Sequence, residues 1–340
     1  MHDVRVRPAA VLHALAALTP LAACNPLLAL ALASCGSSQP QPSAAPTPAT
    51  ATASSPLLAE GDHHVTVNGH DIAYHVHGRG PICIAHPGGP GFDWSYLRMP
   101  EAEASLTIVY LEPIGTGASA RLASPSDYTM SRYAEELEGF RQAAGLDRAC
   151  LIGHSHGGFV AQRYALAHGD RLQALVLYDT SPRIDAEFGA AIGAHAREFF
   201  GTKPWFSDAT AALAAEEAAK TDEEMTAVLG RELPLYFADF DGHADAYRAR
   251  FAGVRVAAAP LHGNDPQPFD TRAELPKLHV PTLVVVGRRD FVTSVPFAEE
   301  LHRAIPGSEL VVLEHSGHLG HIEEPATFAA AVGRFVTAHE

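Results

Sequence analysis

The chain carries one segment, Cys150-Leu-Ile-Gly-His-Ser-His-Gly-Gly158, in which an apolar run passes through a tight turn directly into a helical pattern. The glycines two positions before and two positions after Ser155 let a strand and a helix approach each other closely. In such a unit the serine hydroxyl stands clear of the backbone, near N–H groups at the helix N-terminus that favour negative charge. Ser155 is therefore the candidate nucleophile, and the backbone N–H of His156 is a candidate donor to an oxyanion.

The two histidines that flank Ser155 could also suggest a metal site. However, no Cys, His or Asp residues stand at ligand spacing from His154 and His156. We therefore interpret both as flanks of the turn and expect neither a metal nor a cofactor.

Short apolar runs on either side of this unit predict a β-sheet. The runs from residue 81 on have the length of strands and are apolar on both faces, which is typical of parallel strands covered by helices on both sides. The two runs before them predict a two-strand meander with Asn68-Gly69 at its turn. The predicted strands lie at residues 65–67, 72–76, 81–85, 106–111, 149–153, 173–178, 281–286 and 308–313. Helical patterns alternate with them at residues 130–145, 156–168, 295–305 and 324–337. The alternation predicts an α/β fold whose mostly parallel, eight-stranded sheet has helices on both faces.

One long interval lacks a buried strand pattern. Residues 182–276 are rich in Ala and Glu with helical spacing, and predict a helical cap inserted over the strand ends. The core would then consist of residues 59–181 and 277–340. An aromatic group in the cap is expected to serve packing; its members are Tyr236, Phe237 and Phe240.

The N-terminal segment predicts export. Residues 1–34 hold two arginines followed by an apolar stretch, as in a signal peptide of the lipoprotein type. The run Leu32-Ala-Ser-Cys35 resembles a bacterial lipobox, so Cys35 is the expected lipidation site; Cys24 ends a similar run but is followed by more apolar residues. Residues 35–58 form a Pro/Ser/Ala-rich linker. The sequence therefore predicts a periplasmic or cell-envelope lipoprotein held at the membrane by its lipid, or otherwise a secreted protein.

Composition limits the class of partner. With 24 Lys and Arg against 39 Asp and Glu, the net charge of −15 repels phosphate backbones, so we expect no nucleic-acid partner. The 47% hydrophobic fraction supports a packed core. Four cysteines are too few for a disulfide scaffold at this length. Cys83 and Cys150 lie in apolar runs, and we expect them to be buried and reduced.

A serine nucleophile needs a base to accept its proton, and the base needs a third group to orient it. Asp290 follows the predicted strand at 281–286, and His318 follows the last strand within Ser-Gly-His. Asp179, at the end of another strand, is the second candidate acid. Two further histidines compete with His318 in the same stretch, namely His315 and His321.

Taken together, these motifs resemble the α/β-hydrolase superfamily and, within it, the proline iminopeptidase-like serine peptidases. The resemblance covers about residues 62–340 and rests on Pro87-Gly-Gly-Pro-Gly91, on residues 112–119, on Gly153-His-Ser-His-Gly157, and on the acid and base segments. It implies acyl transfer by Ser155, His318 and Asp290, with the backbone N–H groups of Gly89 and His156 stabilising the oxyanion. The substrate would be a small molecule or a short peptide.

The chain departs from that branch at several positions. The histidine of the family's oxyanion loop is Pro87 here, and the Asp-Gln-Arg of its second loop is Glu112-Pro113-Ile114. His156 replaces the tryptophan that shapes the family's proline pocket. Family members hold the substrate amine with cap glutamates, for which this chain offers Glu216, Glu217, Glu223, Glu224 and Glu232. The leading interpretation is an aminopeptidase for small peptides or amides; an esterase or lactonase and a ligand-binding receptor are the alternatives.

Overall fold

The computed structural model describes residues 56–263, 265 and 267–340. The predicted signal peptide, Cys24, Cys35 and most of the predicted linker lie outside the described residues. The last three residues of that linker form a short 3-10 helix at Pro56–Leu58. Within the described ranges, no helix combines the length and the apolar character needed to cross a membrane.

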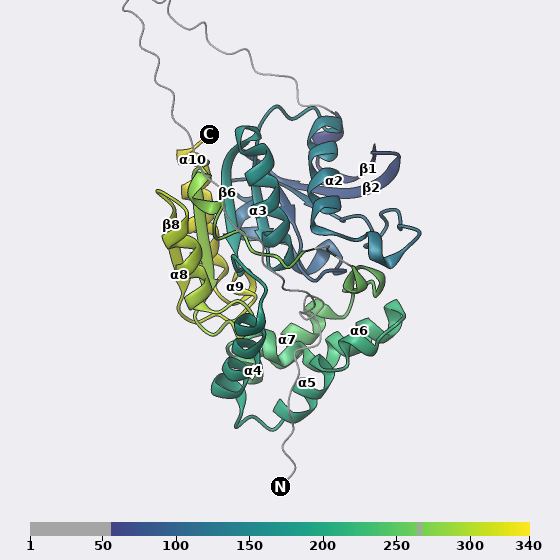
Figure 1. Cartoon of the computed structure of the whole chain (residues 1–340), viewed down its shortest axis with the longest axis vertical. Coiled ribbons are helices and arrows are strands. Elements are labelled where there is room, and N and C mark those ends of the chain that lie inside the picture. Colours follow the sequence, from purple (N-terminus) through teal and green to yellow (C-terminus); the bar gives the residue numbers. More distant parts are fainter. Residues whose placement is uncertain (1–55, 264, 266) are drawn as a thin grey trace, which may run out of the picture. The chain divides into compact units, whose positions relative to one another are not determined.

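The sheet has eight strands in the order β1-β2-β4-β3-β5-β6-β7-β8 (Figure 1). β2 pairs antiparallel with β1 and with β4, and the remaining neighbours are parallel. Their bounds are β1 Gly61–Val67, β2 His70–Gly78, β3 Ile82–His86, β4 Thr107–Leu111, β5 Ala149–His154, β6 Leu172–Tyr178, β7 Thr282–Gly287 and β8 Glu309–Leu313. The predicted fold class is confirmed.

Helices cover both faces of the sheet because alternate strand residues point to opposite sides. On β3, Ile84 packs in one buried cluster with residues of α2 (Met130–Ala143), α3 (His156–His168) and α8 (Val295–Ala304). Its neighbours Cys83 and Ala85 belong to another cluster, which includes residues of α1 (Pro100–Glu103) and α10 (Pro325–Ala338). The short helix α9 (Gly320–Glu323) precedes α10.

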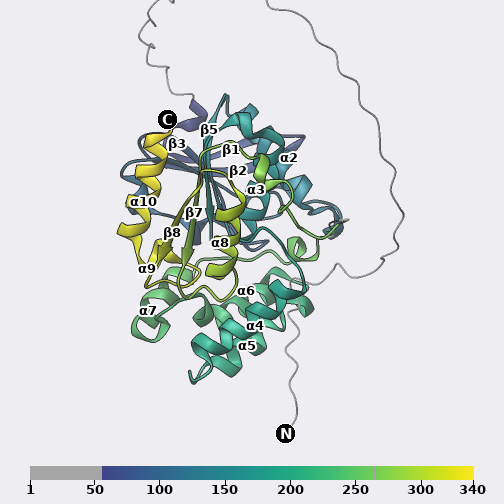
Figure 2. The ribbon, with the colours of Figure 1, turned by 60° about the vertical axis from the view of Figure 1, so that its left-hand side comes forward.

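Four helices stand between β6 and β7, at the end of the sheet where the parallel strands finish (Figures 1 and 2). They are α4 (Ala186–Phe200), α5 (Phe206–Leu213), α6 (Asp222–Glu232) and α7 (Phe240–Phe251). They occupy the interval predicted as a helical cap, whose limits at 182 and 276 stay a prediction. Phe237 and Phe240 are buried as packing residues, whereas Tyr236 is only partly buried and lines a cavity.

Cys83 and Cys150 form a disulfide, so the prediction that they are reduced was wrong. The reason is strand order: β3 and β5 are neighbours in the sheet, and their parallel register pairs these two residues with 4.3 Å between the Cα atoms. The bond joins the strand that leads to residues 87–91 with the strand that leads to Ser155.

Candidate active site

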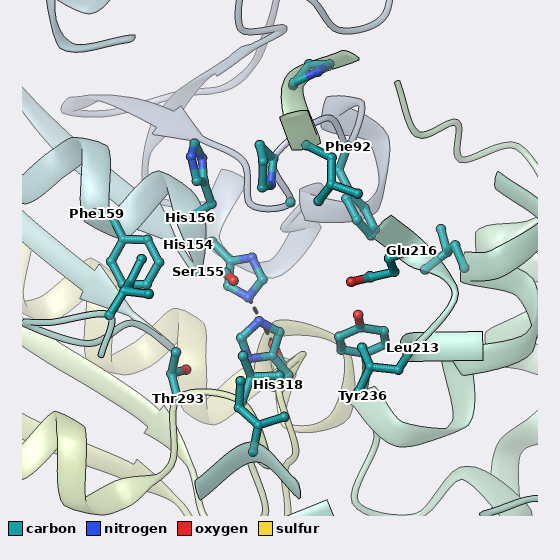
Figure 3. Close-up of a pocket in the computed structure, with 18 of the residues that line it drawn as sticks. Phe92, His154, Ser155, His156, Phe159, Leu213, Glu216, Tyr236, Thr293 and His318 are labelled. Atoms are coloured by element: carbon teal, nitrogen blue, oxygen red, sulfur yellow. Dashed lines mark hydrogen bonds between the residues drawn. The ribbon is translucent and has the colours of Figure 1, made fainter. Parts of the chain in front are cut away.

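A cavity of about 240 Å³ lies between the carboxyl ends of the strands and the cap (Figure 3). Ser155 and His318 face it from the core. Phe159 lines one side, while Glu216 and Tyr236 lie opposite and come from the cap. The cap thus forms the wall against which a bound molecule would rest.

Ser155 stands at the turn between β5 and α3 in a strained backbone conformation. Its φ of 53° is in the left-handed region, which costs a residue with a side chain about 1–3 kcal/mol. The flanking glycines are required by close packing: a β-carbon on Gly157 would lie 2.6 Å from the Pro87 carbonyl oxygen, and one on Gly153 would lie 2.7 Å from Ala161 Cβ. The surrounding structure therefore holds the serine in the exposed turn that the motif predicted.

The structure brings His318 and Asp290 together beside Ser155. His318 Nδ1 lies 2.9 Å from Asp290 Oδ2, and both side chains are buried. Asp290 also accepts hydrogen bonds from Thr293 Oγ1 at 2.5 Å and from the N–H of Val292 at 2.8 Å. Burial opposes ionisation of Asp290, but the His318 ring and these donors outweigh it and hold its pKa below the ordinary value. An ionised Asp290 thus keeps the proton on His318 Nδ1 and leaves Nε2 as the proton acceptor.

The competing histidines lie elsewhere. His315 is exposed. His321 is buried, with its ring nitrogens beside the Tyr178 hydroxyl at 3.1 Å and the Tyr96 carbonyl at 2.9 Å. Burial lowers the pKa of His321 to about 3, so its ring is neutral and held in place.

Asp179 also lies close to His318, but its carboxyl group forms a hydrogen bond with the backbone and not with the His318 ring. Its Oδ1 accepts the Gly287 N–H at 2.9 Å, which ties the end of β6 to the end of β7. Burial and the neighbouring charge of Asp290 raise the pKa of Asp179 well above its ordinary value, so it carries the proton while Asp290 is ionised.

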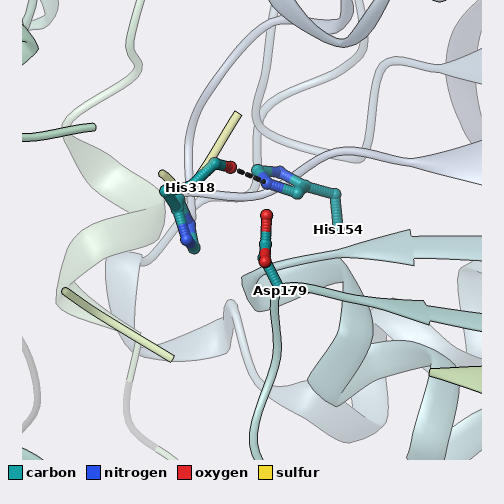
Figure 4. Close-up of side chains that lie close together, drawn as sticks. All are labelled: His154, Asp179 and His318. Carbon is teal, nitrogen blue, oxygen red and sulfur yellow. Dashed lines mark hydrogen bonds between the residues drawn. The ribbon is translucent and has the colours of Figure 1, made fainter. Parts of the chain in front are cut away.

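Among the described residues, one group has the spacing of metal ligands, namely His154, Asp179 and His318 (Figure 4). Both ring nitrogens of His154 already have protein partners. Nδ1 lies 2.8 Å from the Tyr96 hydroxyl, and Nε2 lies 2.9 Å from the His318 carbonyl oxygen. His154 therefore has no free nitrogen for a metal ion, and His318 uses Nδ1 for Asp290, so the three residues do not offer a complete ligand set.

Sequence reasoning missed the role of Tyr96. Its hydroxyl accepts the Gly88 N–H at 2.6 Å and donates to His154 Nδ1, which fixes the His154 proton on Nε2. The resulting chain of hydrogen bonds runs from Gly88 through Tyr96 and His154 to His318. No local motif marks Tyr96, because its hydroxyl joins Gly88 to His154, a residue 58 positions further along the chain.

The candidate oxyanion donors border the serine. Gly89 has a φ of 115°, open to glycine, and a β-carbon on the preceding Gly88 would lie 2.8 Å from Ser155 Cβ. His156 is the first residue of α3, where a backbone N–H has no acceptor within the helix. The His156 ring is buried, and burial lowers its pKa to about 3.

Of the five cap glutamates, the structure buries two. Glu216 lines the cavity, and Glu232 is 1% exposed; the other three, Glu217, Glu223 and Glu224, are exposed. Within the described ranges, neither buried glutamate has an ion pair with Lys or Arg. Burial raises the pKa of Glu232 to about 7, and burial together with Glu232 raises that of Glu216. The pair is an acidic site without a cation.

The chain belongs to the α/β-hydrolase family, because residues 81–325 match the family model described as the alpha/beta hydrolase fold. It is an α/β-fold hydrolase, as the named relatives also indicate. Proline iminopeptidase PfmaB of Pestalotiopsis fici is 28% identical over 269 residues, which cover 76% of this chain and 94% of that protein. The putative carbamate hydrolase RutD of Pseudomonas savastanoi pv. phaseolicola is 26% identical, over 79% of this chain and 98% of that protein.

Among solved structures, the enol-lactonase of Burkholderia xenovorans LB400 has a TM-score of 0.62 at 23% identity, covering 81% of this chain and 100% of that one. This likeness shows the shared fold. The predicted resemblance to the superfamily, and to its proline iminopeptidase-like branch, is confirmed.

Proposed function

We propose that this chain is a serine hydrolase that works by acyl transfer. The observation that carries the proposal is that Ser155 and His318 line one cavity, while the buried Asp290 lies 2.9 Å from His318 Nδ1 behind it. Ser155 is the nucleophile and His318 is the general base. Asp290 orients the His318 ring and stabilises its protonated form. Gly89 and His156 donate their backbone N–H groups to the oxyanion.

The reaction has two halves. His318 Nε2 takes the Ser155 hydroxyl proton while the Ser155 oxygen bonds to the substrate carbonyl carbon, and the carbonyl electrons move to the oxyanion. The oxyanion then collapses, the bond to the leaving group breaks, and that group takes the proton from His318. Water repeats these steps on the acyl-enzyme and releases the acid, so the serine and histidine return to their starting states.

The favoured substrate is a small peptide or amide with a free N-terminal amine. Glu216 and Glu232 support this class. Burial without a cation raises both pKa values, and an ammonium group bound beside the pair would favour the ionised form of these carboxyl groups. The iminopeptidase relatives point the same way. With His156 in place of the family's tryptophan, we do not restrict the first residue to proline.

A small ester, lactone or carbamate is the second candidate. Aromatic and aliphatic side chains dominate the cavity wall, among them Phe92, Phe159, Phe188 and Leu229. Such a wall suits an apolar acyl group, and the same three catalytic side chains cleave esters and amides. The carbamate hydrolase relative is consistent with this alternative.

A matched substrate panel separates the two candidates. It pairs prolyl- and alanyl-arylamides with their N-acetylated counterparts, and adds short acyl esters and lactones. The aminopeptidase proposal predicts cleavage of the free-amine arylamides, at least about tenfold loss on N-acetylation, and a higher KM for E216Q and E232Q. Ester turnover without arylamide cleavage would favour the second candidate. S155A should abolish turnover; a receptor would instead bind its ligand unchanged in that variant.

We also propose that the protein is exported and lipidated at Cys35. The residue pattern of the first 35 positions supports this, and so does the Cys83–Cys150 disulfide, a bond typical of oxidising compartments. Labelling with a palmitate analogue should mark the wild type and C24A, but not C35A. Unlabelled wild-type protein in the soluble secreted fraction would contradict the lipid anchor.

A further inference from the structure

A short cap segment, residues 236–239, lies directly against the loop that carries His318; we call it the strap. It links the 3-10 helix Leu233–Tyr236 to α7. The Tyr236 carbonyl oxygen accepts the His318 N–H at 2.9 Å. A β-carbon on Gly317 would lie 2.6 Å from that oxygen and 3.0 Å from Ala238 N, so only glycine permits this contact.

Glu323, at the end of α9, holds the strap and the histidine loop with one carboxylate. Its Oε1 accepts the N–H of Ala238 at 2.8 Å and that of Asp239 at 3.3 Å. Its Oε2 accepts the Gly317 N–H at 2.6 Å. A carboxylate accepts hydrogen bonds through both oxygens, and bonds to a charged acceptor are about twice as strong as neutral ones. Two segments about 80 residues apart therefore share one strong acceptor.

The strap also reaches the acidic pair in the cap. Tyr236 donates its hydroxyl to Glu232 Oε1 at 3.1 Å, and its ring centroid lies 5.8 Å from that of His318 (Figure 3). One segment thus contacts both the base and Glu232, the buried partner of the cavity-lining Glu216.

We infer that Glu323 is a positioning residue that keeps the His318 loop in register with the strap, and so aligns the base and the acidic wall together. It acts through Gly317 and the strap and touches no reacting atom. The inference rests on the proposed function. It goes further, because it makes the cap part of the alignment of the base as well as part of the binding pocket.

Two kinetic consequences follow from this arrangement. Loosening the His318 loop should lower kcat for every substrate, because a misplacement of about 1 Å can cost up to 10²-fold. Loosening the strap should also raise KM for a substrate whose amine binds at Glu216, because the strap holds Glu232, the partner of Glu216, through Tyr236. A substrate too short to reach the cap should keep its KM.

The test compares E323Q with E324Q. Glu324 is the matched control: its Oε2 accepts the His315 N–H at 2.8 Å and the Ser316 hydroxyl at 2.7 Å, in the same loop but without a strap contact. Burial raises the pKa of Glu323 to about 7, so assays are run at pH 8.5, where the carboxylate is ionised. The substrates are p-nitrophenyl acetate and alanyl-p-nitroanilide, and thermal melts establish that each variant is folded.

The expected result is a kcat loss of about tenfold for both substrates in E323Q, with a KM increase for the anilide alone. E324Q should stay within about twofold of the wild type. Equal losses in both variants, or unchanged kinetics in E323Q, would overturn the inference. If E323Q is unfolded, E323D replaces it, with the same pattern expected.

A separate measurement tests the proposed function, independently of Glu323. The proposed function is wrong if Ser155 of the wild type does not react with a fluorophosphonate probe. The role of Glu323 fails if the wild type and E323Q react at the same rate.

Discussion

At the scale of single residues, two buried aspartates lie near the His318 ring, and their hydrogen bonds separate them. Asp290 contacts Nδ1 at 2.9 Å and accepts further bonds from the 292–293 turn. Asp179 accepts from the Gly287 backbone instead. Ionising two adjacent buried carboxyl groups is unfavourable because their charges repel each other. The carboxyl group with more hydrogen-bond donors is therefore the ionised one.

The two aspartates should respond differently to replacement by asparagine. D290N should lower kcat/KM by about 10³–10⁴-fold, because the amide favours the wrong tautomer of His318. D179N keeps the acceptor for Gly287 and replaces a protonated acid, so it should stay within about threefold of the wild type. Steady-state kinetics at pH 8 measure both. A larger loss in D179N than in D290N would show that Asp179 is the orienting acid.

Removing the Tyr96 hydroxyl should impair catalysis more than binding. Y96F leaves the Gly88 N–H and His154 Nδ1 without a partner beside Ser155, so we expect kcat to fall about tenfold at constant KM. Y110F is the control. The Tyr110 hydroxyl also bonds one backbone N–H and one acceptor, Met99 N and Glu103 Oε1, but lies outside the cavity. Y110F should lose stability while keeping kcat; equal kcat losses would contradict the role of Tyr96.

At the scale of elements, the sequence predicted most of the architecture. All eight strands and the helices α2, α3, α8 and α10 begin or end within about four residues of the predicted positions. Their periodic apolar patterns reflect burial, which is a local property of each strand or helix. The residues that link distant segments could not be found this way. Glu323 acts through backbone N–H groups of other segments, and Tyr96 acts through one backbone N–H and the His154 ring. Such contacts between distant segments leave no local pattern in the sequence.

On the β2 strand, His75 should make stability depend on pH. Its Nδ1 lies 2.7 Å from Asp62 and its Nε2 lies 2.8 Å from Glu112. Burial alone would lower its pKa, but the two carboxylates outweigh burial and raise it. A raised folded-state pKa gives stability that is fully present below the unfolded value of 6.5 and is lost as pH rises through the folded value.

The check is denaturant unfolding of the wild type and H75N. Because solvent screens this half-buried ring, we expect the substitution to cost about 0.5–1 kcal/mol more at pH 6 than at pH 9. E112Q, which removes one charge from the contact, should show a reduced difference between the two pH values. The same cost of H75N at both pH values would contradict this assignment.

At the scale of the whole molecule, the disulfide closes a loop of 67 residues. Such a loop restricts the unfolded chain, so C83A/C150A should unfold with a free energy lower by about 2–4 kcal/mol. Reduction of the wild type should reproduce most of this loss, whereas the double variant should be insensitive to reductant. Melts with and without dithiothreitol measure this. Equal sensitivity of both proteins would show that the bond adds no stability.

The candidate site shows the same division between local and distant information. Ser155 and the strand-end positions of Asp290 and His318 follow from local motifs and chain order. The pairing of Cys83 with Cys150 requires strand order, and the choice of Glu216 and Glu232 among five glutamates requires the packing of the cap. Sequence patterns predict what each segment is, but not which distant segments meet.

The most direct measurement of the central claim is covalent labelling with a fluorophosphonate, followed by mass spectrometry of the digested protein. We expect one adduct, on Ser155, with loss of turnover in proportion to labelling and with labelling strongly slowed in H318A. An adduct on another residue, or hydrolysis that persists in S155A, would contradict the account.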